Sequence, residues 1–138
     1  DTTLWFWQIF TGFAMFFLGS VHLYVIMTHP AEIGPYASSD RVWSEFMWPL
    51  YILLLLAVEF HGSIGLYRLA VKWGWFDGKN PRASRKILKK AKWIVTVVFL
   101  TLGVLSLAAY IKIGIAHKDK VGERYEISSI LETTRDYI

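Results

Sequence analysis

The chain has 138 residues, of which 54% are hydrophobic, with a mean hydropathy of +0.37 and a formal net charge of +4. This composition is more apolar than a soluble domain of this size needs, so a membrane protein is indicated. The sequence contains no cysteine, which excludes disulfides, thiolate zinc sites, cysteine-ligated iron–sulfur clusters and covalent c-type haem attachment within the chain.

Residues 2–28 form the first apolar stretch, in which His22 is the one ionisable side chain. A bilayer core of about 30 Å needs roughly 20 mostly apolar helical residues, since each adds about 1.5 Å. We therefore predict a membrane helix over residues 2–28. Because the chain starts at Asp1 without a methionine and enters this span at once, we expect a processed or incomplete chain.

The connection over residues 29–45 contains Pro30, Gly34 and Pro35. Residues Ser38–Asp40 are predicted to cap a short helical turn that leads into the second membrane helix. That helix is expected over about residues 46–73. Glu59, His61, Arg68 and Lys72 interrupt its apolar run.

Residues 77–92 are predicted to form a Gly/Pro turn and then the basic amphipathic start of the third helix, which continues into a stretch from Trp93 to Ile111 without any charge. We predict the third membrane helix over about 91–115 and a polar tail over 119–138. The expected fold is an all-α membrane protein with three transmembrane helices, in a membrane-spanning haem-binding domain of residues 1–118.

The basic residues are concentrated in one loop. Nine of them, against one acid, lie between positions 68 and 92: Arg68, Lys72, Lys79, Arg82, Arg85, Lys86, Lys89, Lys90 and Lys92. Short cytoplasmic loops are rich in lysine and arginine, so this loop is expected to be cytoplasmic and the first helix to run outward. Anchoring at the membrane surface explains the charge better than nucleic-acid binding, and no nucleic-acid partner is expected.

Two histidines, His22 and His61, lie inside consecutive apolar spans. Ionisable groups in hydrocarbon are costly and are therefore functional candidates, although a membrane histidine can simply hydrogen-bond a neighbouring helix. His22 lies roughly 30 Å along its helix from the cytoplasmic end, and His61 about 16 Å from Lys72. Histidines at such different levels suit two stacked haems, each with a partner histidine from elsewhere. His29 and His117 are expected to be solvated.

Small residues surround both histidines. Gly12 and Gly19 share a helix face with His22, and Ala57 and Gly65 flank His61 four residues on either side. Such residues let a flat macrocycle approach the backbone. Close helix–helix packing selects the same residues in membranes, and the sequence leaves both explanations open.

Glu59 is two residues from His61, about 200° around the helix, so it points away from the face of that histidine. A carboxylic acid buried in the membrane suits proton transfer, because burial favours its neutral form. A hydrogen bond that bridges two helices is the alternative.

Three stretches carry a specific resemblance: "GFAMFFLGSVHLY" around His22, "EFMWPLY" at the start of the second span, and "VEFHGSIGLYRLAVKWGWFDG" around His61. From Asp1 to about Tyr110 the sequence resembles the dihaem cytochrome b subunit of menaquinol:fumarate reductases, in the succinate dehydrogenase/fumarate reductase family. The resemblance implies a five-helix bundle with two haem b groups, of which this chain corresponds to the last three helices.

The resemblance also implies site residues. His22 corresponds to a ligand of the distal haem iron and His61 to one of the proximal haem iron, with partner ligands on the first two helices of the family. Glu59 corresponds to an acid in a transmembrane proton pathway. Groups near the haem propionates correspond to Trp5, Arg41 and Lys72.

The function implied is electron transfer from menaquinol, through two haems, to an iron–sulfur subunit and a FAD-containing flavoprotein subunit that reduces fumarate. The location implied is the bacterial cytoplasmic membrane, as a multi-pass protein. The alternatives are a haem-free membrane anchor whose histidines only pack and hydrogen-bond, and the same subunit working in a succinate:quinone reductase.

Overall fold

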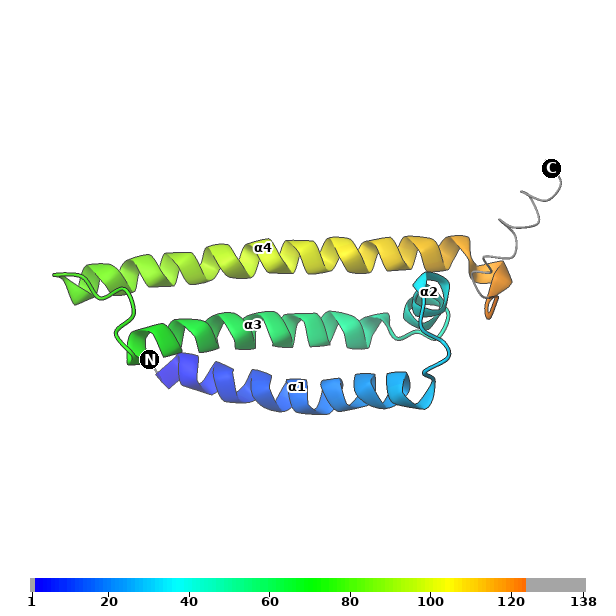
Figure 1. The fold of residues 1–138 in the computed structure, drawn as a ribbon, viewed down its shortest axis with the longest axis horizontal. Coiled ribbons are helices and arrows are strands. Elements are labelled where there is room, and N and C mark those ends of the chain that lie inside the picture. The colour runs from blue at the N-terminus through cyan, green and yellow to red at the C-terminus, as the bar shows by residue number, and fades with distance from the viewer. Residues whose placement is uncertain (1, 124–138) are drawn as a thin grey trace, which may run out of the picture.

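The computed structural model describes residues 2–123 and contains, in that range, four α-helices and a short 3-10 turn. Their bounds are α1 Thr2–Thr28, α2 Pro35–Trp43, α3 Trp48–Lys72, α4 Pro81–Ala116 and η1 Lys118–Lys120. The three long helices lie side by side with α3 in the middle, and the short α2 packs across one end, against α4 (Figure 1).

The prediction of an all-α membrane protein is confirmed, because α1, α3 and α4 are each long and apolar enough to cross a bilayer. The first helix has the predicted bounds. The second is a few residues shorter than expected, since it begins at Trp48, just before Pro49, and ends at Lys72. Proline is tolerated in the first turn of a helix because its missing N–H is not needed there.

The predicted start of the third membrane helix is wrong by ten residues. Helix α4 begins at Pro81, and the Asn80 side chain caps it by accepting hydrogen bonds from the backbone N–H groups of Arg82 and Ala83. The prediction that the basic segment is the amphipathic start of this helix is confirmed, and only the first residue was placed too late. At 36 residues the helix is about 54 Å long, so it extends well beyond a bilayer core of about 30 Å.

The short helix α2 also begins earlier than predicted. Gly34 is its N-cap and Pro35 its first residue, so Ser38–Asp40 lie inside the helix and do not cap it. The Ser39 hydroxyl donates to the carbonyl of Pro35 within the helix, and the Asp40 side chain makes contacts outside it. Proline in the first turn, after glycine, was the stronger start signal in this segment.

Helix α1 presents large apolar side chains outward. Phe13, Phe16 and Phe17 are 63%, 68% and 64% exposed, and Thr11 is the one fully buried residue of this helix in the described chain. Such a surface is unfavourable in water but suits lipid or further helices.

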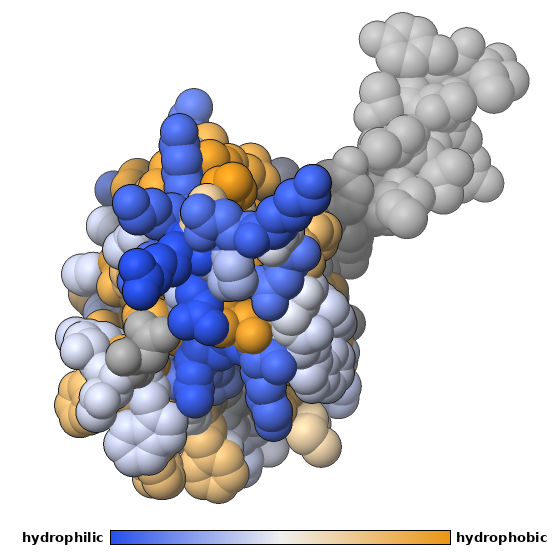
Figure 2. Space-filling model, turned by 90° about the vertical axis from the view of Figure 1, so that its left-hand side faces the viewer, coloured by the Kyte–Doolittle hydropathy of each residue, from blue (hydrophilic) through white to orange (hydrophobic). Residues whose placement is uncertain are grey.

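The two ends of the bundle differ in charge. The N-terminal end of α1, the C-terminal end of α3 and the start of α4 lie together (Figure 1), and basic side chains cluster over this end (Figure 2). We call it the basic end, and we call the opposite end, where α2 lies, the α2 end. Under the expected orientation the basic end is cytoplasmic.

Candidate functional site

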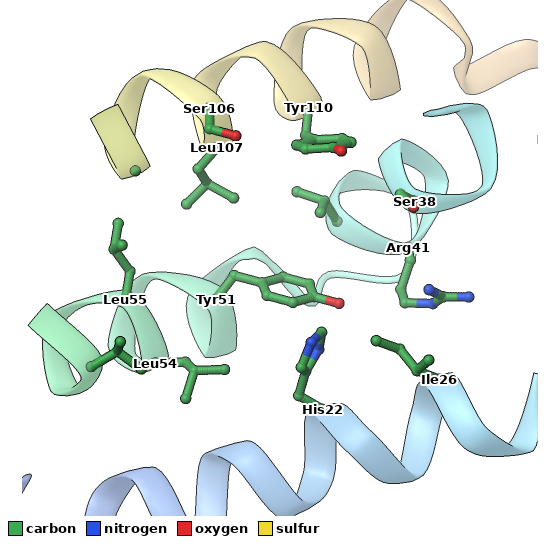
Figure 3. A pocket seen from close by; sticks show the side chains of 13 residues that line it. His22, Ile26, Ser38, Arg41, Tyr51, Leu54, Leu55, Ser106, Leu107 and Tyr110 are labelled. Carbon is green, nitrogen blue, oxygen red and sulfur yellow. The ribbon is translucent and has the colours of Figure 1, made fainter. Parts of the chain in front are cut away.

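A cavity of about 430 Å³ lies near the α2 end, between all four helices (Figure 3). Its lining is mostly apolar, with a histidine, an arginine and a tyrosine among the polar groups. The lining residues are His22, Ile26, Ser38, Arg41, Val42, Tyr51, Leu54, Leu55, Val58, Gly103, Ser106, Leu107 and Tyr110. An apolar cavity with a few convergent polar groups is typical of a cofactor site.

His22 projects from α1 into this cavity, with its ring edge-on to Tyr51 at 5.3 Å between centroids and an interplanar angle of 80° (Figure 3). Its Nδ1 atom is buried and makes no hydrogen bond to any residue in the range 2–123. Leaving a buried polar atom without a partner costs about 1–3 kcal/mol. The ring is therefore suited to a group that the described chain does not supply.

Arg41 brings a positive charge to the same cavity. It is 5% exposed, and its Nη2 atom donates a hydrogen bond of 3.1 Å to the backbone carbonyl of Glu32. The Tyr51 hydroxyl points toward both Arg41 and His22 (Figure 3). A mostly buried guanidinium with one backbone partner can still bind an anionic group on its other nitrogens.

His61 occupies a different position, in the α1–α3 interface. Its Nδ1 lies 3.1 Å from the backbone carbonyl of Gln8 and 3.2 Å from the Thr11 hydroxyl. A bond from Nδ1–H to a carbonyl fixes the tautomer and leaves Nε2 as the basic nitrogen, as in many metal-ligating histidines. Within the described residues Nε2 makes no hydrogen bond.

The two histidines lie at different levels, as the sequence indicated. His61 contacts α1 at Thr11, eleven residues before His22, which corresponds to roughly 16 Å along the helix. His22 lies toward the α2 end and His61 nearer the basic end. One flat cofactor across the bundle could not contact both.

Two of the small residues beside the histidines serve close helix packing, and a third leaves open space. A methyl group on Gly12 would lie 3.2 Å from the His61 ring, and one on Gly65 would lie 2.8 Å from the Gln8 amide nitrogen, so these two glycines allow α1 and α3 to pack closely. Gly19 has nothing within 4 Å and leaves open space on the face of His22.

Glu59 is half-buried on α3 and makes no side-chain hydrogen bond or ion pair with any residue between Thr2 and Glu123. Its backbone carbonyl accepts a 2.7 Å bond from the Ser63 hydroxyl, which is ordinary within a helix. The described helices therefore do not contain the helix-bridging hydrogen bond that was the alternative for this carboxyl group.

Trp5, near the start of α1, and Lys72, the last residue of α3, both lie at the basic end, because α1 starts where α3 ends (Figure 1). Trp5 is 51% exposed, and Lys72 is exposed in the last turn of α3. Arg68 is one turn earlier and partly buried. Neither Arg68 nor Lys72 forms an ion pair with another described residue.

The expectation that His117 is solvated is wrong. It is 9% exposed, its Nδ1 lies 3.0 Å from Asp40 Oδ1, and its ring stacks on Tyr36. The residue follows α4 directly, and α2 folds over that end of α4, a contact that sequence spacing does not reveal. His29 is exposed, as expected, and among the described residues its ring bonds only to Thr28 and Val25, within its own turn.

Three functional candidates were missed by the sequence reasoning: Tyr51 beside His22, and Gln8 and Thr11 beside His61. Gln8 and Thr11 are polar residues in an otherwise apolar span, one turn apart, and this was a usable signal. Tyr51 carried no such signal, because tyrosine is common near the ends of membrane helices.

Both histidines fit haem iron better than a clustered metal site. No three side chains among His, Asp and Glu gather in the described part of the chain. The bis-histidine haem that the resemblance implies has one imidazole on each side of its iron. Neither ring nitrogen of His22 makes a hydrogen bond within the described residues, and the Nε2 of His61 is likewise unused, so each ring is available for one side.

Comparison with known proteins gives consistent matches. Residues 1–108 match the sequence profile of the succinate dehydrogenase/fumarate reductase transmembrane subunit. The chain is 60% identical over 119 residues to the fumarate reductase cytochrome b subunit of Wolinella succinogenes, which covers 86% of the chain and 46% of that relative. It is 56% identical over the same length to the fumarate reductase cytochrome b subunit of Helicobacter pylori strain J99, of which 45% is covered. The chain thus spans about half the length of these relatives.

Proposed function

Because the chain belongs to the succinate dehydrogenase/fumarate reductase transmembrane subunit family, we propose that it carries electrons from menaquinol through two haem b groups to an iron–sulfur subunit. A FAD-containing flavoprotein subunit would then reduce fumarate. The observation that carries this proposal is the placement of His22 and His61, at two levels of one membrane bundle, each with an imidazole nitrogen unused by the described residues.

At the α2 end, His22 would bind the iron of the distal haem. Arg41 would pair with the propionates, whose negative charge should not be buried alone. The apolar wall of the cavity around these two groups supports this assignment, because it would exclude water from the macrocycle. A bound haem supplies one-electron transfer.

At the level of His61, the proximal haem would be bound on the side of α3 nearer the basic end. The backbone carbonyl of Gln8 and the hydroxyl of Thr11 would hold the imidazole in the tautomer that leaves Nε2 for iron. Trp5 and Lys72, both at the basic end, would lie near the propionates that face the cytoplasm.

Each iron then needs a second histidine, which we assign to the two further helices of a five-helix bundle. The exposed phenylalanine surface of α1 supports such neighbours, since in the described chain only α3 covers this helix extensively. Aromatic and small residues on one helix give the van der Waals packing that drives helix association in lipid.

Glu59 would transfer protons. A carboxyl group without a hydrogen-bond partner among the described residues can turn toward water or a neighbouring acceptor and pass a proton between them. Electrons and protons that cross together avoid the charge separation that each electron alone would cause.

The basic end would face the cytoplasm of a bacterium, in a multi-pass protein of the cytoplasmic membrane. Its cluster of lysines and arginines offers a docking surface for the iron–sulfur and flavoprotein subunits (Figure 2). Anionic lipid headgroups would use the same charges. The same parts would serve a succinate:quinone reductase that runs in the opposite direction.

The direct test of this proposal is quinol-driven fumarate reduction by the intact complex in liposomes. We expect reduced menaquinone analogues to drive fumarate reduction at a rate that requires this subunit, while a soluble electron donor drives it at the partner subunits directly. A complex that uses the quinol equally well after this subunit is removed would contradict the proposed function.

A substitution at the basic end is expected to change the properties of the proximal haem without removing a ligand of its iron. Lys72→Ala should lower the midpoint potential of the proximal haem, or its occupancy, more than Arg68→Ala does, because removal of a cation beside a propionate disfavours the more negative, reduced haem. Redox titration of both variants measures this. Equal effects would indicate that both residues are only interfacial anchors.

A further inference from the structure

Helix α2 is fixed to the end of α4 by a buried acid–histidine contact. Four consecutive residues of α2, from Ser39 to Val42, are buried. Asp40 Oδ1 accepts a 3.0 Å bond from His117 Nδ1, and Asp40 Oδ2 accepts a 3.2 Å bond from the backbone N–H of Gly122. Both carboxylate oxygens of Asp40 are therefore satisfied by the segment that follows α4.

Two further contacts hold the same pair of elements together. The Tyr36 ring stacks on the His117 ring at 4.5 Å with an interplanar angle of 13°. On the neighbouring turn of α4, a methyl group on Gly114 would lie 2.6 Å from the Ser39 carbonyl oxygen, so only glycine allows this approach of the backbones. Within residues 2–123, the Asp40–His117 contact is the one contact of 4 Å or less between a carboxylate and a basic side chain.

Arg41, the residue after Asp40 in α2, faces the cavity that contains His22. Arg41 follows Asp40 by about 100° around the helix, so a helix held by Asp40 on one side presents Arg41 on another. The arginine side chain lines the cavity that contains His22 (Figure 3). α2 has few contacts with α3, so its position depends mainly on α4.

We infer that the Asp40–His117 pair is a positioning device, which holds α2 so that the Arg41 guanidinium stays beside the propionates of the distal haem. This inference rests on the proposed function, because it takes the cavity of His22 as the distal haem site. His117 itself does not line that cavity and would act only through Arg41.

The expected change in the midpoint potential of the distal haem has the opposite sign to the direct electrostatic effect of losing the Asp40 charge. Loss of the Asp40 carboxylate alone would remove a negative charge and raise the potential of a nearby haem. Loss of correct Arg41 placement would weaken a favourable charge and lower the potential. His117→Ala removes no carboxylate, so it tests the positioning role more cleanly than a change at Asp40.

The test uses the intact complex and redox titration of its haems. His117→Ala is expected to lower the distal midpoint potential in the same direction as Arg41→Ala, and to leave the proximal potential unchanged. In an Arg41→Ala background the same His117→Ala change should have no further effect. An equal shift in both backgrounds, or no shift in either, would overturn the inference. His29→Ala, at an exposed histidine of the same end, is the matched control.

Two measurements distinguish failure of the positioning role of His117 from failure of the proposed function. Hydrogen exchange of the α2 amides should become faster in His117→Ala, whether or not haem is bound, and unchanged exchange would overturn the positioning role alone. His117→Asn keeps an N–H donor near the place of Nδ1 and should shift the potential less than His117→Ala does. Equal shifts would exclude the hydrogen bond as the cause.

Discussion

A complex that carries Glu59→Gln is expected to assemble with both haems but to lose menaquinol-driven fumarate reduction. Glutamine keeps the size of the side chain and most of its hydrogen-bonding groups, yet it cannot ionise. A proton route through this residue would stop even with the haems in place. Since positioned acids and bases contribute at least about 100-fold to proton-transfer steps, we expect a loss of that order.

The physical reason for coupling protons to electrons is the cost of moving charge across the membrane. An uncompensated elementary charge costs about 2.3 kcal/mol per 100 mV. Under the proposed function, electrons that leave quinol at the outer side would therefore need protons that move inward with them. Glu59 is half-buried and has no side-chain partner among the described residues, so glutamine there breaks no hydrogen bond within the described helices.

The measurement compares two electron donors for one preparation. The Glu59→Gln complex should reduce fumarate normally with a soluble donor, which bypasses the membrane subunit, and fail with the quinol. Glu45→Gln is the matched control, because Glu45 is exposed at the α2 end, outside the membrane helices. Normal quinol-driven turnover in Glu59→Gln would rule out an obligatory proton role.

His61→Ala is expected to remove the proximal haem and leave the distal haem at least partly bound, reducing haem content from two per complex to about one. His22→Ala should do the converse. The reason is the separation of the two rings by roughly 16 Å along α1, which assigns each imidazole to a different macrocycle. His29→Ala should leave both haems bound, since that ring bonds only within its own turn.

Haem content per assembled complex, together with the subunit ratio, measures this prediction. The subunit ratio matters because loss of one haem could also weaken assembly. Loss of both haems from either single variant, in a complex that still contains all its subunits, would contradict two separate sites.

Much of the fold was predictable because membrane spans have a strong sequence signal. Some 20 apolar residues in succession permit few structures other than a helix, and the bounds of α1 were predicted correctly. The basic amphipathic segment was correctly predicted to begin the third helix, but the first residue was placed ten residues too late. Asn80 followed by Pro81 was the local signal for the true start.

The sequence pointed to candidate site residues one at a time, but their contacts with one another could not be read from it. The different levels of His22 and His61 followed from helical rise alone. The bonds from His61 to α1 depend on the rotation of α1 against α3, and the burial of His117 depends on where α2 packs. Both are properties of tertiary packing, which spacing along one chain does not encode.

A reduced-minus-oxidised spectrum of the intact complex will show whether this subunit is a cytochrome with two separate haem b sites, as we propose. We predict b-type absorption bands that titrate in two steps, one for each haem. A fully assembled complex without b-type bands would contradict the claim and favour the haem-free membrane anchor, in which His22 and His61 only pack and hydrogen-bond.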